Sequence, residues 1–458
     1  MAGGRSIIIL ISTPSIFHSR LGSARNPSRR NVLYYTKKNR RLAAKSARSV
    51  AIDFYETAWY NLPAMKKQKK ILRIAIYIET SRAHGRSMLT GIADASQACD
   101  NWQLEPVPPD LLKNPDYARQ FDGLIVRVMD NETANALVKA GKPVIDTYGR
   151  IDDNPLPFIR LDDSGIAKLA SNCFAEHRYM RCAYCGFPGI RFSDARGLLF
   201  RTFVLERGGT CEVFSGDDGR MLSDSYFRNE KMDEVHDERA LRKWVEELPK
   251  PIAVFCCNDL RAYHLLRVCA EAHVAVPEEV AVLGVDNDTL LCAFAKPQLS
   301  SIDTGAFKAG QTAARMLAEA MGSPGRRPSD VMNRPAGIVE RRSTDAYAVN
   351  TPWLSDALVY IRRRLGEGIS TSDVVAHLGY SHTTVNKVFR AELGSSVQQE
   401  IIRQRRERAC RLLVETDQTA AAISAECGYP SPQYFAHQFT AHFGMTPERW
   451  RRHQRPGP

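Results

Sequence analysis

A short pattern of helix, glycine and second helix occurs twice near the end of this 458-residue chain. In the first copy, apolar residues at helical spacing end at Gly379, and Ser381 then stands where it can cap a second helix. In the second copy, Thr419 and Gly428 bracket a short helix, and the next helix begins at Ser431. This repeat constrains the fold strongly, because each amphipathic helix must bury its apolar face against the others.

The start of the first unit and the link between the units can also be predicted. Thr371 or Ser372 is the expected N-cap of the first helix, where a carboxylate in the first turn suits the helix dipole. Residues 398–415 are expected to form one connecting helix. Its apolar residues are expected to face inward, and three arginines are left open to solvent or phosphate: Arg403, Arg406 and Arg408.

The second helix of each unit carries a polar stripe opposite its apolar side. Tyr434, Phe435 and Phe439 are expected to pack inward in the second copy. Two outward helices on a rigid connector can enter successive turns of the major groove, about 34 Å apart. The expected DNA-contacting residues are Thr383, Asn386, Lys387 and Arg390 in the first copy, and Gln433, His437 and Thr440 in the second. Arg390 is expected to hold a phosphate, whereas Thr383, Asn386, Lys387 and Gln433 are expected to contact base edges.

These residues resemble the DNA-binding domain of the AraC/XylS family of bacterial transcription regulators. The resemblance rests on Arg405-xxx-Ala409-xx-Leu412-Leu413, on Cys427-Gly428-Tyr429, and on residues 444–451, Gly-Met-Thr-Pro-Glu-Arg-Trp-Arg. It implies an all-α domain with two helix-turn-helix units that binds a double-stranded DNA operator. For a single helix, the alternative to DNA contact is a polar face that only contacts solvent. The presence of two such faces in a tandem motif makes this alternative the weaker interpretation.

Upstream, short strands alternate with helices over about 280 residues. The strands are expected at residues 71–78, 122–127, 143–146, 158–161, 181–186, 252–256 and 280–285. The helices are expected at residues 86–99, 132–140, 164–177, 193–207 and 260–272. Alternation of this kind predicts parallel sheets with helices on both faces, and the length suits two lobes with a cleft between them.

The second half of this region resembles the sugar-binding effector domain of LacI/GalR regulators and their periplasmic-binding-protein relatives. The segments that carry the resemblance are residues 258–262, 276–287 and 297–302. It implies a two-lobed α/β fold like that of periplasmic binding proteins, with a small sugar as the ligand. The two resemblances in this order imply a sugar-responsive transcription activator of xylose-utilisation genes, with D-xylose as its effector; another pentose or aldose as the effector is the alternative.

A sugar is covered in hydroxyl groups, so carboxylates that accept hydrogen bonds and guanidiniums that donate them suit its recognition. Asp286, at the carboxyl end of an expected strand, is the first candidate carboxylate, and Arg196 is the first candidate donor. Asn258 and Asp259 also end a strand. Further candidates are Arg86, Asp162, Glu79 and Asp146. For each of them the structural alternative is a helix cap or a salt bridge.

The net charge of +12 is concentrated at the two ends of the chain. Residues 1–64 carry +9, residues 65–345 carry −1, and residues 346–458 carry +4. These ranges are the expected domains: a basic extension without helix or strand periodicity, the effector domain and the DNA-binding domain. The solvated tail is the favoured interpretation of the extension, and DNA contact is its alternative.

Other classes of protein are less well supported by the sequence. Cys182 and Cys185 have metal or redox spacing, but no second pair follows, and residues three apart on a strand face opposite ways. We therefore expect no metal, no cofactor and no enzyme, and the cysteines suit a reducing cytoplasm. A sugar-binding receptor would not need the residues after Asp345, and an α/β enzyme would need a phosphate loop or catalytic set. The expected partners are operator DNA, the sugar, RNA polymerase and a second copy of the chain, with no membrane.

Overall fold

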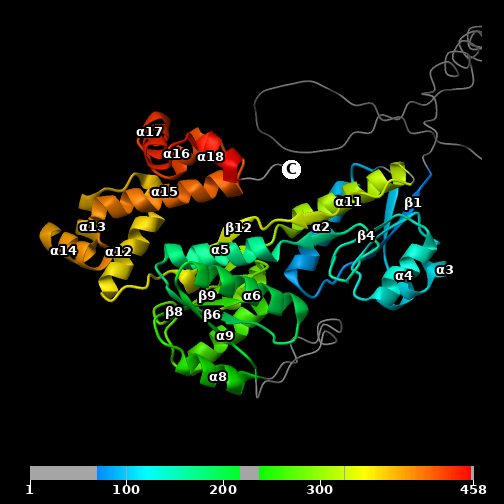
Figure 1. Ribbon diagram of the computed structural model, residues 1–458, viewed down its shortest axis with the longest axis horizontal. Coiled ribbons are helices and arrows are strands. Elements are labelled where there is room, and N and C mark those ends of the chain that lie inside the picture. Colours follow the sequence, from blue (N-terminus) through cyan, green and yellow to red (C-terminus); the bar gives the residue numbers. More distant parts are fainter. Residues whose placement is uncertain (1–69, 100, 217–236, 324, 455–458) are drawn as a thin grey trace, which may run out of the picture. The chain divides into compact units, whose positions relative to one another are not determined.

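A computed structural model describes residues 70–99, 101–216, 237–323 and 325–454 of the chain. The basic extension predicted for residues 1–64 lies outside the described residues. Two α/β lobes and a helical region follow one another from residue 70 onward (Figure 1).

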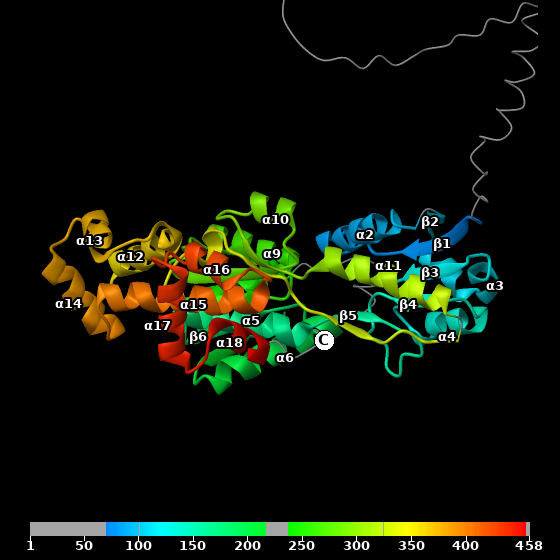
Figure 2. The same ribbon diagram turned by 90° about the horizontal axis from the view of Figure 1, so that it is seen from above.

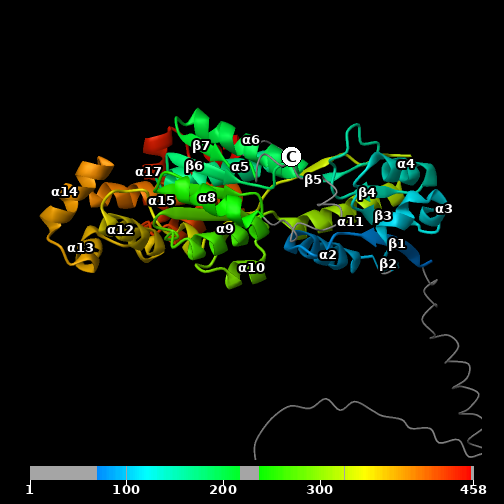
Figure 3. The same cartoon turned by 90° about the horizontal axis from the view of Figure 1, so that it is seen from below.

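The amino-terminal lobe is built on a parallel sheet that is covered on both faces. Its strand order is β2 (Trp102–Pro106), β1 (Leu72–Tyr77), β3 (Gly123–Val126) and β4 (Val144–Asp146). One face packs against α2 (Ala83–Ser96) and α11 (Ala306–Gly322), which lie side by side in Figures 2 and 3. The other face packs against η1 (Pro109–Lys113), α3 (Pro115–Ala118) and α4 (Asn131–Ala140).

The carboxyl-terminal lobe has a larger sheet of the same type. Its strand order is β12 (Gly337–Val339), β10 (Ser300–Asp303), β9 (Val280–Val285), β8 (Ile252–Cys256), β6 (Arg181–Cys185) and β7 (Thr210–Val213), parallel except for β12. One face packs against α5 (Asp163–Glu176) and α6 (Arg191–Glu206), the other against α8 (Glu238–Glu247) and α9 (Asp259–Glu271). The short helix α10 (Thr289–Phe294) follows β9.

The chain crosses between the lobes on either side of α11 and again after β4. Although α11 follows β10 of the carboxyl-terminal lobe, it packs on the amino-terminal lobe. Two of the crossing segments pair as a small parallel sheet, β5 (Ile159–Leu161) with β11 (Val331–Asn333). The predicted two-lobed architecture is confirmed, and these crossings give the cleft its hinge.

Cys182 and Cys185 belong to the cores on opposite faces of β6. Both are free thiols, and both are buried. No group of residues that could hold a metal ion is found in the described ranges. No helix of the same ranges is long and apolar enough to cross a membrane.

The helical region consists of two small cores joined by one long helix. Its elements are α12 (Pro352–Arg363), α13 (Thr371–Leu378), α14 (His382–Leu393), α15 (Val397–Glu415), α16 (Ala420–Glu426), α17 (Pro432–Phe443) and α18 (Pro447–Gln454), with a short 3-10 turn η4 (Leu365–Glu367). The turn η3 (Arg342–Thr344), which precedes them, packs on β9 and β10 of the carboxyl-terminal lobe. On α15, Val397 and Ile401 enter the first core, while Ala409 and Leu413 enter the second. The connecting helix therefore belongs to both units and fixes them together.

The caps of these helices follow the sequence closely, with one correction. Ser381, Thr419 and Ser431 cap α14, α16 and α17 as predicted. The N-cap of α13 is Ser370, one residue before the predicted position. The Ser370 side chain accepts from the Asp373 backbone amide while the Asp373 side chain accepts from the Ser370 backbone, and this reciprocal pair fixes the start of the helix.

Candidate functional site

A cavity of about 100 Å³ lies between the two lobes. The amino-terminal lobe and the crossing segment contribute Glu79, Arg82, His84, Arg127, Tyr148 and Arg150 to its lining. The carboxyl-terminal lobe contributes Phe192, Arg196, Asn258 and Asp286. Four of the candidate ligand-binding residues therefore come together here: Asp286, Arg196, Asn258 and Glu79.

Asp286 directly follows β9, at the carboxyl end of the sheet. Its backbone has φ +106°, an unusual conformation for a residue with a side chain. Burial raises the pKa of its carboxyl group to about 7, although the nearby Arg196 guanidinium acts in the opposite direction. A carboxyl group with a raised pKa in a cleft is typical of a functional site.

Arg196 reaches the cavity from α6 and is almost completely buried. Its Nε and Nη2 atoms lie 3.2 and 2.8 Å from Asp163 Oδ1, and Nη1 donates to the Cys257 carbonyl oxygen. The guanidinium carbon lies 5.5 Å from the centre of the Phe192 ring. Because it is held on both sides, this guanidinium can meet a ligand without losing conformational freedom on binding.

Glu79 and Asn258 line the cavity and also order the backbone beside it. Glu79 Oε1 accepts from the Arg82 backbone amide at 3.2 Å and so shapes the loop before α2. Asn258 is the N-cap of α9, where its Oδ1 accepts from the Arg261 amide at 2.9 Å.

The other candidates have structural contacts away from the cavity lining. Asp162 caps α5, with its Oδ1 2.9 Å from the Gly165 amide. Asp259 is fully buried and accepts from the Asp288 amide and the Ser301 hydroxyl at 2.7 and 2.6 Å. Arg86 forms an ion pair with Asp288 at 2.9 Å. Asp162 therefore fits the alternative of a helix cap and Arg86 that of a salt bridge, whereas Asp259 holds the segment after β9 to β10 through hydrogen bonds.

Asp146 acts on the cavity through the loop that follows β4. Its carboxylate accepts from the amides of Val128, Tyr148 and Gly149 and from the Asn154 side chain. It therefore positions Tyr148, which does line the cavity.

Most of the basic residues that line the cavity were not predicted from the sequence. Arg127 directly follows β3 and Arg150 lies in the loop after β4, so both stand at carboxyl ends of strands. Asp286 was chosen because it stands at the carboxyl end of a strand, and the same criterion could have identified Arg127 and Arg150. His84 was also missed; burial, followed by the positive charge of Arg127, lowers its pKa to about 4 and keeps the imidazole neutral.

The outer face of α14 carries the predicted polar stripe. Thr383, Lys387 and Arg390 are exposed, and together with His382, Ser396 and Gln398 they line a shallow groove. Asn386 is half-buried: its Oδ1 accepts from the Val397 amide at 3.3 Å and its Nδ2 donates to the His382 carbonyl at 3.1 Å. Asn386 therefore connects α14 to the start of α15.

The second stripe, on α17, exposes Gln433, His437 and Thr440. Phe435 and Phe439 are buried, as predicted. Tyr434 was predicted to pack inward, and this is wrong, because 45% of its surface is exposed. The core of this unit is filled by Phe435, Phe439 and Trp450 instead, which leaves Tyr434 on the side of the helix.

Two of the three arginines that were expected to be available on the connecting helix, Arg403 and Arg408, form ion pairs instead. Arg403 lies 2.5 Å from both Glu400 and Glu407, and Arg408 lies 3.0 Å from Glu426. Arg406 lies 3.3 Å from His442. Glu400 and Glu407 lie three and four residues from Arg403 on α15, so helical spacing could have revealed them, whereas Glu426 belongs to α16 and is brought to Arg408 by the tertiary structure.

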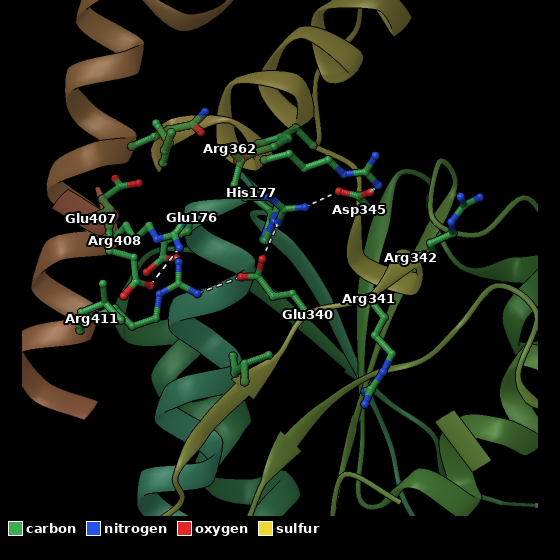
Figure 4. A pocket seen from close by; sticks show the side chains of 17 residues that line it. Glu176, His177, Glu340, Arg341, Arg342, Asp345, Arg362, Glu407, Arg408 and Arg411 are labelled. Atoms are coloured by element: carbon green, nitrogen blue, oxygen red, sulfur yellow. Dashed lines mark hydrogen bonds and ion pairs between the residues drawn. The ribbon is translucent and has the colours of Figure 1, made fainter. Parts of the chain in front are cut away.

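A network of ion pairs joins the helical region to the carboxyl-terminal lobe (Figure 4). Arg411 of α15 lies 3.2 Å from Glu176 and 2.8 Å from Glu340, both of the lobe. Arg362 of α12 contacts His177 and Asp345 and lies 3.3 Å from Glu340. Burial alone would raise the pKa of Glu340, but the two facing guanidiniums outweigh it and lower the pKa to about 2.

A second ion pair lies beside this network. Arg178, two residues after the end of α5, lies 3.0 Å from Glu400 of α15, whose side chain is fully buried. Separating the partners of a buried ion pair leaves a buried charge without compensation, which is energetically costly. Such contacts therefore resist separation. The lobe and the helical region are thus held together by charge as well as by the chain that connects them.

Two family models match separate parts of the chain. Residues 172–344 match a periplasmic binding protein-like domain and residues 374–453 match a helix-turn-helix domain. The xylose operon regulatory protein of Escherichia coli (strain K12) is 28% identical over 389 residues, which cover 83% of this chain and 96% of that protein. The chain is a homologue of the xylose operon regulators. The protein of the same name from Haemophilus influenzae is 26% identical over 386 residues, which cover 83% of this chain and 98% of that protein.

A solved structure agrees with these relatives. The structure of the xylose-binding transcription activator xylR matches with a TM-score of 0.52 at 26% identity, and covers 84% of this chain and 98% of that one. Our chain is accordingly a sugar-responsive, DNA-binding transcription regulator and not an enzyme. The predicted fold class, a periplasmic-binding-protein-like effector domain before an AraC-type helical domain, is confirmed.

Proposed function

We propose that this regulator binds a sugar of the xylose class between its lobes, and that binding changes its affinity for an operator. The observation that carries this proposal is the cavity in which Asp286 and Arg196 of one lobe face Glu79 of the other. Carboxylates accept from sugar hydroxyls and guanidiniums donate to them. D-xylose is the first ligand to test, because the relatives are named for it, and another pentose or aldose is the alternative.

The ion-pair network suggests how the signal travels. Glu176 and Glu340 belong to the carboxyl-terminal lobe and hold Arg411 of the helical region. The helical region then moves with that lobe when the lobes close on a ligand. A ligand can drive this change only by binding the closed state more tightly than the open one.

The DNA contacts are proposed from the exposed stripes. We assign Thr383 and Lys387 of α14, and Gln433, His437 and Thr440 of α17, to the major groove, with Arg390 on a phosphate. Asn386 keeps its assignment as a base contact, in addition to its bond to α15. A regulator of this type works on chromosomal DNA, so we place it in the cytoplasm.

We also propose that the regulator acts as a homodimer that contacts RNA polymerase and activates transcription. Two chains would double the number of helices that enter the groove, and paired half-sites are the usual geometry of helix-turn-helix regulators. Light scattering on the full chain with its DNA gives the number of chains in the complex, and one chain per operator would contradict the dimer.

A gel-shift experiment tests the central proposal. DNA fragments are selected from a random pool by the full chain, and their affinity is measured with and without D-xylose or a panel of pentoses and aldoses. We expect sequence-selective binding that a sugar changes, and loss of the sugar response in Asp286→Ala. If no sugar alters the affinity or if the selected DNA shows no common sequence, the proposal is wrong.

A further inference from the structure

Arg86 and Asp288 form an ion pair between the two lobes, beside the cavity but outside its lining. Arg86 belongs to α2 of the amino-terminal lobe, and Asp288 is the N-cap of α10 in the carboxyl-terminal lobe. Arg86 Nη2 lies 2.9 Å from Asp288 Oδ2. The pair therefore connects the lobes without occupying the space of a ligand.

The guanidinium of Arg86 is held in place by the loop that follows β1. Its Nη1 donates to the carbonyl oxygens of Thr80 and Ser81 at 3.0 and 2.7 Å. The same loop begins with Glu79, which lines the cavity. Because these bonds already fix the guanidinium, little side-chain freedom is lost when it meets Asp288.

The carboxylate of Asp288 is fixed on the carboxyl-terminal lobe. Its Oδ1 accepts from the amides of Leu290 and Leu291 at 3.1 and 3.3 Å and so caps α10, while its Oδ2 accepts from Arg86. The side chain of Asp288 is only 9% exposed. Asp286, the carboxylate proposed to accept from the sugar, lies two residues earlier in the same loop.

The ion pair thus joins two loops that each bring a carboxylate to the cavity, Glu79 on one side and Asp286 on the other. An opening of the cleft that moves these loops apart must also draw Arg86 away from Asp288. The carboxylate of Asp288 would then stay largely buried without its cation, which is energetically costly. The pair therefore favours the arrangement in which both loops face the same cavity.

We infer that Arg86 and Asp288 are a positioning pair for the ligand, which holds the loops of Glu79 and Asp286 closed around a sugar that the pair itself does not touch. This inference rests on the proposed sugar-responsive function and names two residues on which the affinity for the sugar depends. The apparent dissociation constant of a ligand that binds only the closed form is its intrinsic value divided by the closed fraction. Removal of the pair lowers that fraction and weakens binding, although no contact with the sugar is lost.

The first test is calorimetric titration of the full chain with D-xylose. Arg86→Met and Asp288→Asn each remove the ion pair, and asparagine keeps an N-cap on α10. Each variant should raise the dissociation constant about fivefold. The double variant should bind no more weakly than either single one, because all three lack the same interaction. Arg86→Lys keeps the charge and should restore part of the affinity.

Arg73→Met is the matched control for Arg86→Met. Arg73 belongs to the same lobe and is exposed to a similar degree, 45% against 43%, but it pairs with Glu105 within that lobe. Its loss removes an ion pair that does not cross the cleft. The dissociation constant for D-xylose should therefore stay unchanged in Arg73→Met.

The second test is hydrogen exchange of the full chain without any sugar, measured by mass spectrometry. Each substitution should speed amide exchange on the opposite lobe, because the two loops are released together. Arg86→Met should act on residues 286–291, and Asp288→Asn should act on residues 79–86. A role confined to one lobe would change only the segment around the substitution.

The outcomes separate this inference from the function on which it rests. If Arg86→Met binds D-xylose as tightly as the unaltered chain, or if the effects of the two substitutions add in the double variant, the inference is overturned and the proposed function stands. Faster exchange on the substituted lobe alone overturns it as well. If the unaltered chain binds neither D-xylose nor any of a panel of other pentoses and aldoses, the sugar-responsive function fails and the inference fails with it.

Discussion

Asp286 illustrates how one residue acquires its chemistry from backbone and surroundings together. Its φ of +106° is a strained conformation, which costs about 1–3 kcal/mol and persists only where the surrounding structure enforces it. The conformation occurs directly after β9, where the chain turns at the edge of the cavity. Burial then raises the pKa of the carboxyl group to about 7.

This pKa predicts that the affinity for D-xylose depends on pH near neutrality. Below about pH 7 the Asp286 carboxyl is protonated, and above it the ionised form accepts from sugar hydroxyls. The groups that act on it are Arg196 and Arg82, which favour ionisation, and Asp288 and Glu79, which oppose it. At one pH unit below the pKa, about a tenth of the chains are ionised, so the dissociation constant should rise about tenfold.

Titration calorimetry with D-xylose across this pH range measures the effect. Asp286→Asn should bind more weakly and lose the pH dependence. A dissociation constant of the unaltered chain that stays level from pH 6 to pH 8 would contradict the assignment of Asp286 as the accepting carboxylate.

The side chains proposed to contact DNA are of two kinds, those that bind a phosphate and those that contact a base. Arg390→Ala should weaken binding to every sequence and lower the salt dependence by about one unit of slope, because a phosphate contact is lost. Gln433→Ala should instead relax selectivity at particular base pairs, at a cost of about 1–3 kcal/mol. Gel shifts on a set of single-base operator variants distinguish the two. Equal losses on all sequences for both variants would refute the division of roles.

At the scale of the element, α15 is the helix on which the two units depend. Its first turns enter one core and its last turns enter the other. The link is reinforced where Gly428, after α16, meets the turn η4 of the first unit. Gly428 has φ +70°, and a Cβ atom there would lie 1.8 Å from the Leu365 carbonyl oxygen.

Gly428→Ala should therefore destabilise the helical region by about 3 kcal/mol or more, since backbone strain adds to a clash with main-chain atoms. Gly444→Ala is the control, because Gly444 has the nearly identical φ of +71° but open space around the missing Cβ. It should cost only about 1 kcal/mol. Thermal unfolding followed by circular dichroism measures both. Equal shifts in melting temperature would show that the contact with Leu365 contributes nothing.

At the scale of the whole described chain, the ion-pair network decides which parts move as one. Glu340 is held by Arg362 and Arg411 from two different helices. Its folded-state pKa of about 2 lies below the ordinary value of 4.5, so the pairing is fully present above that value and is lost only as pH falls toward 2. The connection is therefore intact at neutral pH.

Arg411→Met should release the helical region from the lobe, because Glu176 and Glu340 lose a cation that both contact. Breaking a buried pair from one side costs about 3–5 kcal/mol. We expect DNA binding that no longer responds to the effector. The control is Arg408→Met on the same helix, whose partner Glu426 lies within the helical region. Gel shifts with and without sugar compare them, and a full sugar response in Arg411→Met would exclude this coupling.

Local signals in the sequence determined the order of elements and the start of most helices in the helical region. Ser381, Thr419 and Ser431 each accept from an amide three residues away, so the sequence alone reveals them. The alternation of strands and helices predicted both lobes, because parallel sheets need crossover helices. Tyr434 was misplaced because core residues of other helices, such as Leu413 of α15 and Trp450 of α18, decide which side of α17 is buried.

Only the tertiary structure decided which charged residues share a site. Arg127, Arg150 and Asp286 lie on different segments, and they meet because the chain crosses repeatedly between the lobes. Arg411 and Glu340 are separated by 71 positions, and nothing in either neighbourhood marks them as partners. Electrostatic energy depends on distance in space and on burial, and the order of residues encodes neither until the lobes have packed.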